Sequence, residues 1–160
     1  ALPVLDRAQF APAENLARGG YVLSDFAISP VYFARVVLIA SGSEVHLALE
    51  AQQALAKLDI AACVVNMPSW ELFDRQSPEY RESVLPETIR ARVAIEAGST
   101  LAWARYVGER GAVVGLDSFG TSAPYQDAYQ FFVLTVAAIV RAALRICEPI
   151  YDVEALWHSA

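Results

Sequence analysis

The residues that could do chemistry in this chain lie mostly where predicted strands end. They are hydroxyl groups and two carboxylates: Ser41, Ser43, Ser69, Glu96, Ser99, Thr100 and Asp117. Hydroxyl groups and backbone amides at a helix start can bind an anion, and two carboxylates can serve as general acid and base. Each also has an ordinary structural interpretation, helix capping for the serines and hydrogen bonds to loop amides for the acids. Both interpretations stay open for this set, which we call the strand-end rim.

Histidine and cysteine are too scarce to build a site of their own. Of the two histidines, His46 and His158, the first falls one turn into a predicted helix. At that position we expect the imidazole to be solvated or to cap the helix, and the alternative is that it donates a hydrogen bond towards the rim. Cys63 and Cys147 have no neighbouring ligand pair, so we expect two reduced, buried thiols and neither zinc nor redox chemistry. An acid–base site would therefore consist mainly of carboxylates.

Complete catalytic motifs are missing around the rim. The run from Ser41 to Glu44 has capping-box spacing but neither a P-loop lysine nor a Gly-x-Gly-x-x-Gly pattern. Ser69 follows Pro68 without a Gly-x-Ser-x-Gly elbow, which favours helix capping over a nucleophile. The residues alone therefore predict a domain without a self-sufficient active site.

Alternating strands and helices must position the rim. Short apolar runs predict parallel strands over 36–40, 61–67, 91–97 and 112–116, and an antiparallel strand over 21–23. Helices are predicted after Ser41, after Pro68, over 78–84, after Thr100 and after Pro124, with Thr135 capping the last one. This alternation favours an α/β fold, a three-layer α/β/α sandwich with a mostly parallel open sheet and one antiparallel strand. Ligands of such sheets bind beyond the carboxyl ends of the strands, which is where the rim lies.

Composition limits the partners. The chain has 160 residues, enough for one domain, and its 12 basic and 18 acidic residues give a net charge of −6. The single lysine and scattered arginines do not suit nucleic acid, and the longest apolar run, 131–140, is too short to cross a membrane. No leader is recognised, so a cytoplasmic location is expected. With 56% apolar residues, we expect an apolar surface for a protein partner, carried by Trp103, Tyr106 and Phe119.

Several short sequence segments occur in the same order as in a known protein family. They are Ala17–Leu23, Leu38–Val45, Val64–Ser69, Phe73–Gln76, Tyr80–Pro86, Ala91–Val93, Glu96–Gly98 and Phe119–Pro124. They resemble the C-terminal domain of transketolase over roughly residues 1–146. The resemblance implies a linker from an absent preceding domain over 1–18, the domain itself over 19–146, and an extension beyond the usual family end over 147–160.

Transketolases are thiamine-diphosphate enzymes of the pentose phosphate pathway that transfer a two-carbon ketol unit between sugar phosphates. The resemblance implies that thiamine diphosphate and Mg²⁺ (or Ca²⁺) bind to other domains, so no catalytic, cofactor-binding or metal-binding residue is carried over to this segment. It also implies partners, namely the preceding transketolase domains and a second subunit in a homodimer. The segment alone is then inactive and supports the dimer. Two alternatives stay open: a split-gene subunit that completes the enzyme with a partner chain, and a free-standing binding module that uses the rim.

One departure from the family concerns Val133. It stands where the family usually has a glycine after Phe132. If that glycine serves a positive φ, valine must strain the turn or change its conformation.

Overall fold

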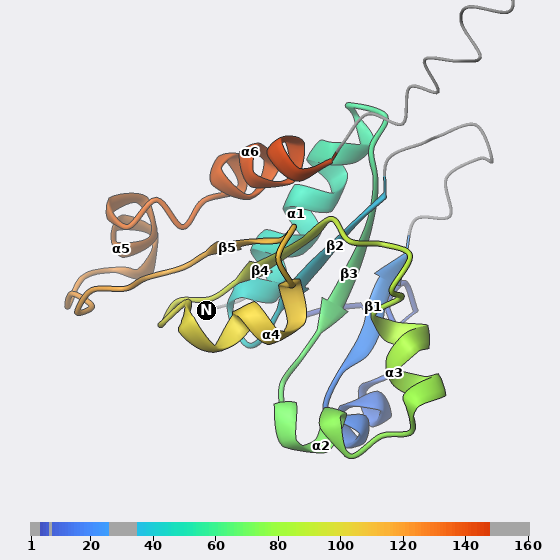
Figure 1. Ribbon diagram of the computed structural model, residues 1–160. Coiled ribbons are helices and arrows are strands. Elements are labelled where there is room, and N and C mark those ends of the chain that lie inside the picture. The colour runs from blue at the N-terminus through green and yellow to red at the C-terminus, as the bar shows by residue number, and fades with distance from the viewer. Residues whose placement is uncertain (1–3, 7, 26–34, 148–160) are drawn as a thin grey trace, which may run out of the picture.

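The computed structural model describes residues 4–6, 8–25 and 35–147. Strands and helices alternate along the chain (Figure 1). The strands are β1 (Tyr21–Asp25), β2 (Arg35–Ala40), β3 (Ala61–Asn66), β4 (Arg92–Ile95) and β5 (Ala112–Val114). The helices are α1 (Glu44–Ala56), α2 (Trp70–Asp74), α3 (Pro78–Val84), α4 (Ala104–Val107), α5 (Tyr125–Phe131) and α6 (Val136–Ile146), with 3-10 helices η1 (Ala13–Arg18) and η2 (Leu101–Trp103).

The strands form one five-stranded sheet in the order β1-β3-β2-β4-β5. Neighbouring strands are parallel except for β1, which pairs antiparallel with β3. Ala40 stands opposite both Asn66 of β3 and Ile95 of β4, and Ile95 stands opposite Val114 of β5. The carboxyl ends of the four parallel strands are therefore level, which brings the loops that follow them to one side of the sheet.

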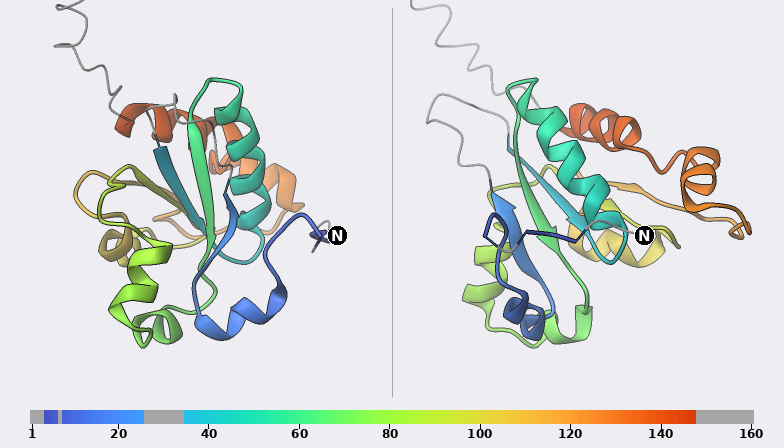
Figure 2. Two further views of the ribbon diagram at one scale, coloured as in Figure 1. Left: turned by 90° about the vertical axis from the view of Figure 1, so that its right-hand side faces the viewer. Right: turned by 180° about the vertical axis from the view of Figure 1, so that it is seen from behind.

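Helices cover both faces of the sheet, because β2 is apolar on both sides. Val36 and Leu38 belong to a core packed under α1 and α6, whereas Val37 and Ile39 belong to a second core with residues of α2, α3 and α4. Figure 2 (left) shows the strands between α1 on one side and α3 and α4 on the other. The predicted three-layer α/β fold with one antiparallel strand is confirmed.

The described part of the segment expected as a linker over 1–18 folds onto the domain. Ala13–Arg18 forms η1, and Leu5, Phe10 and Ala11 pack against the core under α1. The backbone N–H of Ala11 donates to the carbonyl of Leu23 in β1 at 3.1 Å. The described part of this segment is therefore integrated into the domain, because its apolar side chains reach the core.

The last two helices meet at a sharp turn. Residues 125–146 have the length and apolar character of a membrane-spanning helix, but the structure divides them into α5 and α6, and Ile139 and Ala143 of α6 are buried against the domain. Thr135 caps α6, as predicted, by accepting a hydrogen bond from Ala138 N at 3.3 Å. Val133 in the turn has a φ of +58°, so the positive φ inferred for the family's glycine is present here with a β-branched residue.

Candidate functional site

The strand-end rim contains the topological switch point of the sheet. From β2 the chain passes through α1 to β3 on one side, and then returns across β2 to reach β4 on the other. The loops after β2 and β4 therefore diverge to opposite faces, and such a point is where open α/β sheets most often bind ligands. The side chains at this point are Ser43, Glu44 and Glu96.

Glu44 is the centre of a buried polar cluster. It is 5% exposed, and its carboxylate accepts hydrogen bonds from the Ser43 hydroxyl at 2.6 Å and from the Tyr129 hydroxyl on α5. The hydroxyl oxygens of Ser43 and Tyr129 are 2.9 Å apart. Burial, followed by the hydrogen bond to Glu44, raises the pKa of Tyr129 to about 12. The cluster ties the start of α1 to α5.

The capping box expected at Ser41 and Glu44 is wrong. No side chain caps α1. The hydroxyl of Ser43, the residue before the helix, donates a hydrogen bond to the Glu44 carboxylate instead. Glu44 does not reach back to Ser41 because its carboxylate is bound by Tyr129. Ser41 contributes its carbonyl oxygen, which accepts from Glu44 N at 3.2 Å.

The two rim acids expected as a catalytic pair are separately engaged. Glu96 accepts a hydrogen bond from the indole Nε1 of Trp103 at 3.2 Å. Asp117 accepts from the backbone N–H of Thr100 at 2.9 Å and from its hydroxyl at 2.7 Å. The structure thus favours the ordinary interpretation for Asp117, a hydrogen bond to a loop amide.

The two acids also differ electrostatically. Burial raises the pKa of Glu96, the bond from Trp103 opposes that shift, and the charge of Glu44 adds to it. The Thr100 hydrogen bonds lower the pKa of Asp117, which is exposed. Within the described residues, the hydrogen bonds of Glu96 and of Asp117 go to different partners, Trp103 and Thr100.

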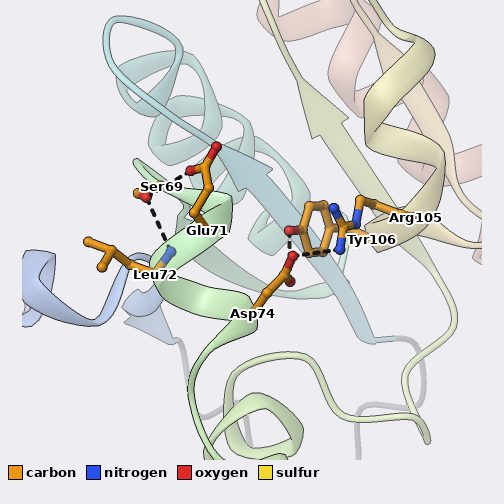
Figure 3. A network of polar contacts seen from close by, with 6 residues as sticks. All are labelled: Ser69, Glu71, Leu72, Asp74, Arg105 and Tyr106. Atoms are coloured by element: carbon orange, nitrogen blue, oxygen red, sulfur yellow. Dashed lines mark hydrogen bonds and ion pairs between the residues drawn. The ribbon is translucent and has the colours of Figure 1, made fainter.

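Ser69 caps α2, as predicted. Its hydroxyl oxygen accepts from Leu72 N at 3.3 Å and donates to Glu71 at 3.1 Å (Figure 3). At the other end of α2, Asp74 accepts hydrogen bonds from Tyr106 at 3.0 Å and from Arg105 at 2.5 Å. The Asp74 contacts join α2 to α4, and the Ser69 contacts are those of a helix cap.

The remaining rim candidates have local roles. The Ser99 hydroxyl accepts from Leu101 N at 3.4 Å. His46 is half-buried on α1, and its imidazole makes no hydrogen bond within the described residues. At the end of β3, Asn66 donates to the Tyr21 hydroxyl at 3.0 Å, while its buried Oδ1 has no partner in the part of the chain that the structure describes. Asn66 and Tyr129 were missed in the sequence because their neighbours are distant along the chain.

The aromatic residues expected at an interface separate into two groups. Trp103 is 1% and Tyr106 6% exposed, and both pack with Trp70. The expectation that they form an outer patch is wrong, because this aromatic cluster fills the chain's own core. Phe119 is 99% exposed in the loop after β5. It borders an open pocket of about 520 Å³ between the loops after β4 and β5.

The rim does not suit a magnesium–diphosphate group. Such a group needs cationic or amide donors for its phosphates and several oxygen ligands for its metal. The rim instead presents the carboxylates of Glu96 and Asp117, whose negative charges would repel phosphate, and Glu44 is buried beside them. The described residues contain no cluster of three metal-ligating side chains. The described rim side chains therefore do not fit a magnesium–diphosphate group.

A family model matches residues 19–135, and its description is "Transketolase-like TK C-terminal domain". The chain belongs to this family. It is 46% identical over 147 residues to a transketolase from Halalkalibacterium halodurans. The aligned region covers 92% of this chain and 22% of the relative. Among solved structures, transketolase from Leishmania mexicana superposes with a TM-score of 0.70 at 35% identity, over 89% of this chain and 21% of that one.

A third comparison concerns the fold alone. A chain described as "Split gene transketolase, inactive beta4 tetramer" superposes with a TM-score of 0.58 at 23% identity, over 81% of this chain and 42% of that chain. The curated transketolase relatives are much longer than the matched part, since this chain spans 22% and 25% of two of them.

Proposed function

We propose that this chain acts as the C-terminal domain of a transketolase. In this proposal it is a structural, dimer-supporting part of a thiamine-diphosphate enzyme that transfers two-carbon ketol units between sugar phosphates in the cytoplasm. The observation that carries the proposal is the 46% identity over 147 residues to a transketolase. The catalytic residues and the cofactor would then belong to the preceding domains.

The hydrogen bonds of the rim support a structural role. Glu44, Glu96, Asp117 and Ser69 each use their polar atoms to join two elements or to cap a helix. A catalytic centre instead requires a nucleophile next to a free base, or donors that converge on an open position. The rim chemistry therefore holds loops in place.

The Phe119 loop supports docking to another domain or subunit. A phenylalanine that is 99% exposed beside an open pocket costs free energy in water. Contact with a neighbouring protein surface would remove that cost. We therefore assign the loop after β5 to the surface that meets the rest of the enzyme.

The first test uses the chain alone. Calorimetric titration with thiamine diphosphate and Mg²⁺ is expected to show no saturable binding, and an assay with xylulose 5-phosphate and ribose 5-phosphate no transfer. Saturable binding at micromolar cofactor would contradict the proposal.

The second test joins the chain to the preceding transketolase domains in one polypeptide. Phe119→Ser should lower the activity and the dimer fraction of that enzyme. Leu58→Ser is the matched control, because Leu58 is 52% exposed at the opposite end of α1 from the rim. Equal effects of the two substitutions would remove the Phe119 loop from the proposal.

A second candidate is a split-gene subunit, favoured by the structural likeness to a split-gene transketolase chain. Mixing this chain with a separate chain that carries the preceding domains distinguishes the two. Activity restored by mixing supports the split-gene subunit, whereas activity that requires a covalent link supports a domain of one polypeptide.

A further inference from the structure

The sheet leaves one of its edges beside a cationic groove. In the described residues β5 pairs only with β4, so the other side of β5 borders a groove of about 570 Å³. Residues of α6 line its other side, together with Phe132 and Val133 of the turn before α6. We call this the β5–α6 groove.

The groove combines apolar surface with unpaired positive charge. Val113, Val133 and Ile146 give it apolar walls, while Arg141 and Arg145 lie along α6 one turn apart. Both arginines are exposed and form no ion pair within the described residues. The groove is thus suited to an occupant that has apolar and acidic side chains together.

A segment of this composition follows the groove directly. Ile146 lines the groove, and residues 148–160 begin two positions later; they lie outside the described residues. The segment carries three acids and no lysine or arginine, with apolar residues interspersed: Glu148, Ile150, Tyr151, Asp152, Val153, Glu154, Leu156 and Trp157.

The segment after Cys147 is long enough to run the length of α6. The 11 residues of α6 rise about 16 Å at about 1.5 Å each. Six extended residues, 148–153, reach about 20 Å. The segment can therefore return along the whole groove from Ile146 to Val133. Because it is tethered at the groove, its effective concentration there is on the order of millimolar, far above that of a free peptide.

We propose that residues 148–160 dock in the β5–α6 groove of their own chain. Their acidic side chains pair with Arg141 and Arg145, and their apolar side chains cover the exposed edge of β5. This inference is independent of the proposed transketolase function, since it concerns an extension beyond the residues 19–135 that the family model matches.

Amide hydrogen exchange of the 160-residue chain tests the proposal. The variant Arg141→Glu/Arg145→Glu should raise exchange within 112–115 and 148–160 by about fivefold, because two ion pairs become repulsive. The matched control is Arg81→Glu/Arg90→Glu, two exposed arginines outside the groove. The control has the same net charge and should exchange like the wild type in both segments.

Reversing the charge of two acids in residues 148–160 provides a second experiment, which leaves the sequence of the folded domain unchanged. Asp152→Lys/Glu154→Lys should raise exchange in 112–115, and combining it with Arg141→Glu/Arg145→Glu should restore protection. Equal exchange in the wild type and both reversed variants overturns the proposal, as does an equal rise in the control. Protection that grows between about 5 μM and about 200 μM protein would mean a second copy's tail, and would overturn docking within one chain.

Discussion

The hydroxyl group of Tyr129 on α5 donates a hydrogen bond to the carboxylate of Glu44, the first residue of α1, across 85 positions of sequence. Glu44 is 5% exposed. A carboxylate at the start of a helix is favoured by the helix dipole, but its burial requires donors. Tyr129 and Ser43 supply them, so α5, which comes late in the chain, is hydrogen-bonded to the start of α1 at the switch point of the sheet.

Replacing Tyr129 by phenylalanine should lower the free energy of unfolding by about 1.5 kcal/mol, because a buried charged acceptor loses a donor. Urea unfolding measures the change. Tyr125→Phe is the control, since Tyr125 on the same helix is 46% exposed and contacts Tyr129 through its ring. A loss of the same size in both variants would show that the hydroxyl of Tyr129 is not the cause.

Stability should fall at high pH. Burial raises the pKa of both Tyr129 and Tyr106 to about 12, from 10.0. Their folded pKa values exceed the unfolded ones, so the stabilisation is complete below pH 10 and is lost as the pH rises towards 12. Urea midpoints across this range measure the slope. Tyr129→Phe should make the decline shallower, and an unchanged decline would contradict this assignment.

Glu96→Gln should maintain or raise stability at neutral pH, by up to about 1 kcal/mol. The amide keeps an oxygen acceptor for Trp103 Nε1 and removes a charge that is partly buried and repelled by Glu44. Thermal unfolding tests this. Glu96→Leu, which removes the acceptor, should destabilise the protein, and destabilisation by Gln as large as by Leu would show that the negative charge itself is required.

Gly19→Ala should destabilise the protein severely, by about 3 kcal/mol or more, because the new Cβ adds a clash to a strained backbone. Gly19 has a φ of +79°, and a Cβ there would lie 2.3 Å from the Ser69 carbonyl oxygen. Gly42 has a φ of +54° but open space around it, so Gly42→Ala should cost only about 1 kcal/mol. Similar unfolding free energies for the two variants would contradict the close approach at Gly19.

Val133→Gly should raise the unfolding free energy by about 1 kcal/mol. Glycine relieves the cost of the positive φ, and this gain exceeds the loss that results from the greater flexibility of glycine in the unfolded chain. Val133 has a φ of +58° and is 53% exposed, so little packing is lost. Val133→Ala serves as control, since it removes the methyl groups but keeps a Cβ. A lower melting temperature for the glycine variant would show that the valine side chain stabilises the turn.

The sheet could be predicted from the sequence because local patterns decide it. The run Val36–Ala40 is apolar at every position, as a strand covered on both faces must be, and Thr135 stands where a helix needs a cap. The cluster of Glu44 and Tyr129 could not be predicted, because no local spacing records a contact across 85 positions. Trp103 was misjudged for a related reason: an aromatic after a strand end has the same sequence signal whether it faces the core or a partner.

The hydrogen bond from Ala11 to Leu23 has a consequence for the solubility of fragments. The family match begins at Gly19, and a fragment cut there would keep all the strands. It would also lose the backbone that occupies part of the outer side of β1, together with the apolar cover given by Leu5 and Phe10. An uncovered strand edge recruits strands from other molecules. A fragment trimmed to the family boundary should therefore precipitate where the longer chain stays dispersed.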